Sequence, residues 1–199
     1  MAVNETAADK GAGAESAIEI WRRLEAKGAR VRYRPVTREE IEEAERKLAV
    51  RFPPSYVELV TQLGAPAALP RLPPGADPEL AENLDFTVLL PREVVQWTEE
   101  LRSSLEPDML EEPESFDRVR AQLDNAIFFQ FGVDAGEGYV FLIDTADASG
   151  EMKVGDYSHE YIEELDWSAT SRAVFPSLAA SIASAAAQIE GSWEEYGGR

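Results

Sequence analysis

Apolar positions recur with helical spacing between residues 37 and 64, and this pattern predicts two helices joined by a short hydrophobic elbow. Thr37 and Glu40 have the spacing of a capping box, in which both side chains accept hydrogen bonds from amides at a helix start. Pro53 or Pro54 starts the second helix, because amides of a first turn have no partner within the helix. Gly64 suits the left-handed residue that ends a helix.

Other segments repeat the helical spacing. Residues 18–27 form a short amphipathic helix that Gly28 ends. Residues 92–105 form a helix, and Trp97 or Thr98 completes its apolar face. Residues 159–167 are a candidate for a short acidic helix, and residues 176–190 form the last helix.

Aromatic and β-branched residues predict the strands. These are residues 84–90, 126–132, 139–143 and 151–157, of which the last three form a meander. The turn between residues 132 and 139 and the loop at residues 144–150 are rich in Gly and Asp, as turns require. Residues 30–36 form either a short edge strand or an extended lead into the capping box.

Three segments lack a clear pattern of this kind. Residues 1–17 are predicted to be a disordered tail, which leaves residues 18–195 as a single domain. Five prolines between residues 65 and 83 argue against a helix or a central strand there, so this stretch is either a binding loop or an insertion. Residues 106–117 form an acidic, exposed connector.

Composition limits the cellular setting. A chain of 199 residues buries a substantial core without covalent staples, and the absence of cysteine excludes disulfides. The first 16 residues lack the basic and apolar regions of a signal peptide. No run approaches the ~18 apolar residues that span a bilayer. We therefore expect a cytoplasmic protein that does not enter membranes.

Charge narrows the choice of partner. The chain has 38 Asp and Glu against 19 Lys and Arg, a net charge of −19. Binding to nucleic acid or anionic membranes requires clustered Lys and Arg, so we expect neither. The charge favours a soluble monomer or a basic partner, since opposite fields steer encounter, although solubility alone also explains it. The basic residues between 22 and 38 are interpreted as an intramolecular counterweight to acidic neighbours.

Few residues can carry chemistry. His159 is the sole histidine and no serine stands in a G-x-S-x-G elbow, so neither a Ser-His-Asp triad nor a zinc site is expected. Carboxylates that suit Mg²⁺ or Ca²⁺ cluster in two turns, at Asp134 and Glu137 and at Asp144, Asp147 and Glu151. Turn chemistry requires the same residues. We therefore expect a protein that is not an enzyme and that has no cofactor and no metal.

The helical pair and the meander resemble the SMI1/KNR4 (SUKH) superfamily. Its motif is an E-x-x-L-x-V core, then Phe-Pro-Pro-x-Tyr and an apolar helix that ends in Gly. The matching positions are Glu45, Leu48, Val50, Phe52, Pro53, Tyr56, Leu59 and Gly64. Glycine-rich turns before a strand that ends in Asp also resemble the family, at Gly132, Gly136, Gly138 and Asp144. The resemblance implies an α+β domain with a mostly antiparallel central sheet, flanked by N-terminal helices and a C-terminal helix.

The resemblance also implies a function. Many bacterial members are immunity proteins that bind and neutralise a cognate toxin, often a nuclease, and a basic toxin would suit the acidic charge of this chain. The best candidates for the contact are acids of the β-rich half, namely Asp134, Glu137, Asp156, Glu160, Glu163 and Glu164. An intracellular scaffold or regulator is the alternative, and an enzyme that works through carboxylates or a metal is a third hypothesis.

Overall fold

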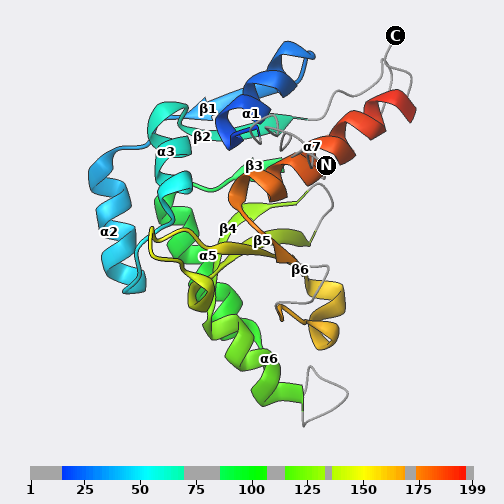
Figure 1. Cartoon of the computed structure of the whole chain (residues 1–199). Helices are drawn as coiled ribbons and strands as arrows, with labels where there is room; N and C mark the ends of the chain where they lie inside the picture. The colour runs from blue at the N-terminus through cyan, green and yellow to red at the C-terminus, as the bar shows by residue number, and fades with distance from the viewer. Residues whose placement is uncertain (1–14, 70–85, 107–114, 133–135, 169–173, 196–199) are drawn as a thin grey trace, which may run out of the picture.

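A single antiparallel sheet organises the chain. The computed structural model describes residues 15–69, 86–106, 115–132, 136–168 and 174–195. Seven strands of this part follow one another across the sheet in chain order, and each pairs antiparallel with the next (Figure 1). They are β1 (Arg30–Arg34), β2 (Ala65–Leu69), β3 (Phe86–Val88), β4 (Ala126–Phe131), β5 (Glu137–Leu142), β6 (Lys153–Ser158) and β7 (Val174–Phe175).

Helices cover both faces of this sheet. They are α1 (Ala17–Ala26), α2 (Arg38–Leu48), α3 (Pro54–Gln62), α5 (Pro91–Ser104), α6 (Ser115–Asp124) and α7 (Leu178–Glu195), with short 3-10 helices η2 (Ile143–Thr145) and η3 (His159–Glu164). Figure 1 shows α7 beside α1 at one face, with α5 on the other side of the sheet. The predicted α+β fold, with an antiparallel sheet between N-terminal helices and a C-terminal helix, is confirmed.

Alternation along β4 builds the core on both faces. Phe128 and Trp97 of α5 have ring centroids 6.3 Å apart on the α5 face. The next residue, Phe129, points the opposite way and stacks on Phe141 of β5 with centroids 3.8 Å apart. Tyr56 of α3 closes this second face, edge-on to both rings.

The predicted helix signals are present in the structure. The Thr37 hydroxyl accepts from the amide of Glu40 at 3.2 Å, and the Glu40 carboxylate accepts from the amide of Thr37 at 2.8 Å. Pro54 is the first residue of α3, and Gly64 follows the helix with a φ of 85°. A methyl group at Gly64 would lie 2.5 Å from the Arg34 carbonyl oxygen, so the close approach of β1 also requires glycine.

Part of the basic segment pairs with acids of the same chain, as predicted for the whole segment. Arg34 makes two bonds of 2.9 Å to the Glu93 carboxylate and donates to the Val88 carbonyl oxygen at 2.6 Å. Arg23 pairs with Glu190 of α7, to which Lys27 also donates at 2.7 Å. The two pairs with Glu190 fasten the N-terminal helix to the C-terminal one. Of the two alternatives for residues 30–36, the edge strand is correct.

The expectation that residues 65–83 form no central strand is wrong at its start, because Ala65–Leu69 is the inner strand β2. Pairing with β3 is limited to Ala67 and Ala68, so Pro66 lies where β2 has a neighbour on one side only. The missing proline amide therefore breaks no ladder toward β3. The rest of the proline-rich stretch, up to residue 83, lies outside the described residues.

The connector was predicted too long at its C-terminal end, and α6 was not predicted. Its first residues, 115–117, belong to the helix Ser115–Asp124, which buries Val119 and Leu123 one turn apart. The short strand β7 was also missed, and the segment after β6 is the 3-10 helix η3, followed at residues 165–168 by chain without regular secondary structure. Residues 1–14 of the predicted tail lie outside the described residues, and α1 begins at Ala17.

Candidate functional site

The six predicted contact acids do not form one described patch. Asp134 lies outside the described residues, and the side chains of Glu163 and Glu164 in η3 do too. Glu137 begins β5 and is therefore a strand residue, whereas the sequence placed it in the preceding turn. Glu160 is exposed in η3.

Asp156 and the next residue of its strand, Tyr157, point to opposite faces of the sheet. Its register partner is Tyr139, whose ring lies 5.9 Å from Phe175 just before α7. Tyr157 points to the α5 face, where its ring meets Phe128 edge-on at 6.0 Å. Asp156 is exposed, yet nearby atoms displace enough solvent to raise the pKa of its carboxyl, an effect that the Tyr157 amide opposes.

The site that the structure does assemble is a groove on the α5 face, here called the aromatic groove. Its volume is about 220 Å³. Trp97 and Leu101 of α5 form one wall, and Phe128, Phe131 and Tyr157 of the sheet form the floor. Trp97, Phe131 and Tyr157 are each only partly buried, so aromatic surface faces solvent here.

A β-bulge and one glycine create this floor. The register between β4 and β5 shifts between Phe128 and Gln130, and the extra residue brings Phe131 to the same face as Phe128. Phe131 and Tyr157 both pair with Gly138, one on each side. A methyl group at Gly138 would lie 2.3 Å from the Phe128 ring, so glycine leaves the space that the ring fills.

The rim of the groove is polar. Glu100 and Ser104 of α5 lie on one side, and Gly136, Glu137 and His159 lie on the other. Among the described residues that line the groove, two are acids and none is Lys or Arg. The groove therefore combines an apolar floor with negative charge at its edge.

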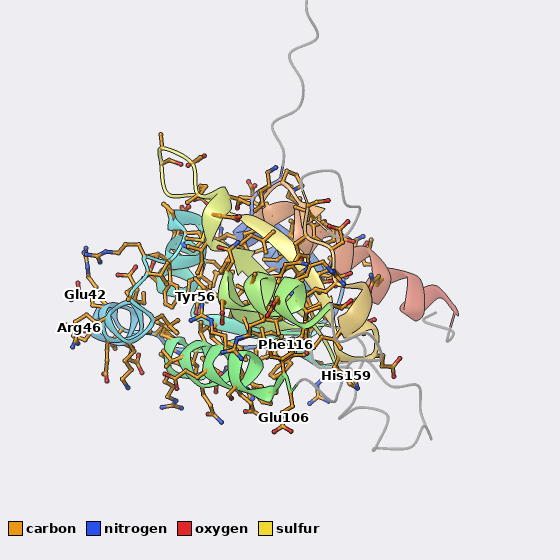
Figure 2. All side chains as sticks on the ribbon, turned by 90° about the horizontal axis from the view of Figure 1, so that it is seen from below. Glu42, Arg46, Tyr56, Glu106, Phe116 and His159 are labelled. Atoms are coloured by element: carbon orange, nitrogen blue, oxygen red, sulfur yellow. The ribbon has the colours of Figure 1, made fainter. Side chains whose placement is uncertain are left out.

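His159 has a structural explanation at this rim. Its amide donates to the Gly136 carbonyl oxygen at 3.2 Å, and its Nδ1 lies 3.1 Å from the same oxygen. Gly136 has a φ of 82°, and a methyl group there would lie 1.9 Å from Nδ1. The ring thus lies on Gly136, and Figure 2 shows it across the molecule from Glu42 and Arg46 of α2.

The family-motif residues of the helical pair are structural. Glu45 is 9% exposed, and its carboxylate accepts from the Phe52 amide at 2.9 Å and from Arg51 at 2.5 Å. Phe52, Tyr56 and Leu59 are buried, and the Tyr56 hydroxyl donates to the Leu89 carbonyl oxygen at 2.9 Å. The outer residues of α2 around Glu42 and Arg46 line a second, open hollow of mixed polarity.

The acidic loop after β5 shows the chemistry of a turn. Asp147 accepts from the hydroxyl and the amide of Ser149 and from the amide of Glu151, and these hydrogen bonds lower the pKa of its carboxyl. The Glu151 carboxylate accepts from both the amide and the hydroxyl of Ser55, each at 2.7 Å, a contact that the sequence did not predict. Asp144 lies within the 3-10 helix η2, and its amide donates to the side-chain oxygen of Asn125 at 3.0 Å.

The described part of the chain lacks two kinds of feature. No group of three or more His, Cys, Asp or Glu in this part of the chain could hold a metal ion. No helix among the same residues is long and apolar enough to cross a bilayer.

Sequence reasoning missed the aromatic groove. The sequence offers Trp97 only as an alternative to Thr98 for the apolar face of its helix, and the structure buries Thr98 fully while Trp97 stays half-buried. The three phenylalanines within Ala126–Phe131 are a visible signal in the sequence. In a regular strand, Phe128 and Phe131 would lie on opposite faces of the sheet. The sequence does not reveal the bulge, so it does not predict that these two rings share one surface.

Comparison with known proteins identifies the family. The profile of the SMI1 / KNR4 family (SUKH-1) matches residues 35–183, about three quarters of the chain. No curated protein and no solved structure matches. Domains of this family are commonly immunity proteins and are generally non-catalytic. With the helical pair, the antiparallel sheet and the C-terminal helix in place, the chain belongs to the SMI1/KNR4 (SUKH-1) family.

Proposed function

We propose that this protein is an immunity protein, which binds one cognate bacterial toxin and neutralises it by stoichiometric contact. Immunity is a common role of the family. The proposal needs a surface that can bind another protein, and it needs no catalytic group.

The aromatic groove is the observation that carries the proposal. Exposed tryptophan and tyrosine are the residues that most often anchor protein interfaces, because they bury a large area with little loss of side-chain freedom. Trp97 and Tyr157 offer such anchors, and Phe131 extends the same surface.

Charge supports a basic toxin, and a nuclease in particular. A nuclease that grips phosphate carries basic side chains, and a chain of net charge −19 would be steered toward it. Glu100 and Glu137 put acids at the groove itself, which favours a partner whose contact surface is basic. Of the predicted acids, Glu137 and Glu160 are retained as contact candidates near the aromatic groove. Asp156 is a candidate on the opposite face of the sheet.

Rescue of growth tests the proposal. The product of each gene adjacent to this one is expressed in a sensitive host, with and without this protein. We expect one product to stop growth, and we expect this protein to restore growth and to form a 1:1 complex with that product. The association rate should fall as salt is raised, because screening weakens steering.

Two results would count against the proposal. If no adjacent product is toxic or bound, the immunity role is wrong. If affinity purification from native cells recovers several endogenous partners in place of one, the protein is a scaffold or regulator. The free protein should elute as a monomer in either case.

A further inference from the structure

We infer that the aromatic groove holds a single arginine side chain supplied by the protein partner. The inference rests on the proposed function, because it names the group that a basic partner would insert. The partner is thereby defined by its chemistry, as a protein with an exposed arginine on a basic surface.

Size favours one side chain over a small-molecule ligand. The groove has a volume of about 220 Å³. Sites for cofactors and drug-sized ligands are usually ~300–1,000 Å³. A long side chain from another protein fits the smaller space, and such anchors in a central pocket dominate many interfaces.

The aromatic floor selects the chemistry of that side chain. A guanidinium is planar and weakly hydrated, and it stacks on aromatic faces with a favourable cation–π attraction. The half-buried rings of Trp97, Phe131 and Tyr157 present surface of this kind. The aliphatic stem of arginine can pack against Leu101 and the edge of Phe128 at the same time.

Charge complementarity decides between an arginine and a neutral apolar residue. Glu100 is exposed on α5 at the rim, and Glu137 lies at the opposite side on β5. Apart from these two acids, the titratable side chains among the described lining residues are His159 and Tyr157. None of the described lining residues is a lysine or arginine. A cation is attracted to this site, whereas a leucine or phenylalanine would use only the floor.

Peptide binding observed by NMR tests the inference without a known partner. The probe is acetyl-Gly-Arg-Gly-amide, added to the full chain labelled with ¹⁵N. We expect saturable binding at about millimolar concentration, the range for a ligand of this size, with shifts at the Trp97 indole and at the amides of Phe131 and Tyr157. The citrulline peptide has nearly the same shape without the charge, and it should bind roughly tenfold more weakly.

Two neighbouring acids give a matched pair of variants. Glu99 and Glu100 are both exposed on α5, but only Glu100 lines the groove. Glu100→Gln should weaken the arginine peptide about two- to fivefold, and Glu99→Gln should leave its affinity nearly unchanged. Trp97→Leu keeps an apolar side chain and removes the indole face, and should weaken binding at least about threefold. Glu100→Gln keeps the test valid if Trp97→Leu does not fold.

Several results would overturn the inference. Equal affinity for the arginine and citrulline peptides would show that the charge plays no part. Shifts spread over the surface, or no saturable shift, would mean that the groove is not an arginine site. A dimer that depends on Trp97 would show that a second copy of the chain fills the groove.

The two proposals can fail separately. If a toxin is rescued and bound but Trp97→Leu and Glu100→Gln leave its dissociation constant unchanged, the immunity role stands and the groove assignment is wrong. If the peptide binds as expected but no adjacent product is rescued, the arginine site stands and the toxin assignment is wrong.

Discussion

Two tyrosines show how differently the two faces of the sheet are built. Tyr56 on α3 is fully buried, its ring meets Phe52 and Phe141 edge-on, and its hydroxyl donates to the Leu89 carbonyl oxygen at 2.9 Å. Burial raises the pKa of the Tyr56 hydroxyl far above its usual value, so it stays protonated as a donor. Tyr157 on β6 also has an aromatic neighbour, Phe128, but one side of its ring remains accessible in the groove.

The contrast separates the residues that form the fold from those that are available for binding. At the helical pair, buried polar groups are satisfied within the chain, as the Tyr56 hydroxyl and the Glu45 carboxylate show. At the groove, aromatic side chains make contacts with one another and still expose surface. The residues of the family motif are therefore structural, and the surface available to a partner lies on the α5 face of the sheet, opposite the face that Tyr56 covers.

The largest expected effect is on stability at Tyr56. Tyr56→Ala should lower the free energy of unfolding by about 3–5 kcal/mol, the cost of removing a fully buried aromatic ring. Tyr157→Ala should cost about 1 kcal/mol, because a half-buried ring loses less surface. Chemical denaturation followed by circular dichroism measures both. Equal losses would mean that Tyr157 belongs to the core and that the contrast is wrong.

A smaller effect is expected at Glu45. Glu45→Ala leaves the Phe52 amide without its acceptor, and should lower the free energy of unfolding by about 1–3 kcal/mol. Glu42→Ala on the same helix removes an exposed pair with Arg38 at 3.3 Å and should cost about 0.3–0.5 kcal/mol. Denaturation curves compare the two variants. A cost at Glu42 as large as that at Glu45 would contradict the structural role of the buried carboxylate.

At the helix cap we expect an effect at the lower end of the range given for Glu45. Thr37→Ala removes the side-chain acceptor for the Glu40 amide at 3.2 Å and should lower the free energy of unfolding by about 1 kcal/mol. The arginine peptide should bind this variant as it binds the unaltered protein, because the cap and the groove share no residue. Altered peptide binding would show that the helical pair and the groove are coupled.

Local patterns made much of the fold predictable. The Thr37–Glu40 cap, the helix start at Pro54 and the glycine after α3 depend on residues within a few positions of one another. The central strands β4 and β5 were found from their aromatic and β-branched content. Helix α6 was missed because only Val119 and Leu123 of its inner face are fully buried, and β2 was missed because its proline argued against a strand.

The candidate site was less predictable than the fold. The sequence named acids in turns, and the structure places Asp156 and Tyr157 on opposite faces of β6, so neighbours in sequence do not share a surface. Which of Trp97 and Thr98 faces solvent depended on how α5 packs on β4. No local signal fixes such a packing angle.

The sequence by itself determined the helical pair, the core strands, the acidic charge and the family, because each follows from short-range spacing or from composition. Only the tertiary structure decided that Trp97, Phe128, Phe131 and Tyr157 meet in one groove. That meeting requires a bulge in β4, a glycine at position 138 and a helix laid across the sheet. These features join residues about 60 positions apart, and the contacts that hold them form only when the chain is folded.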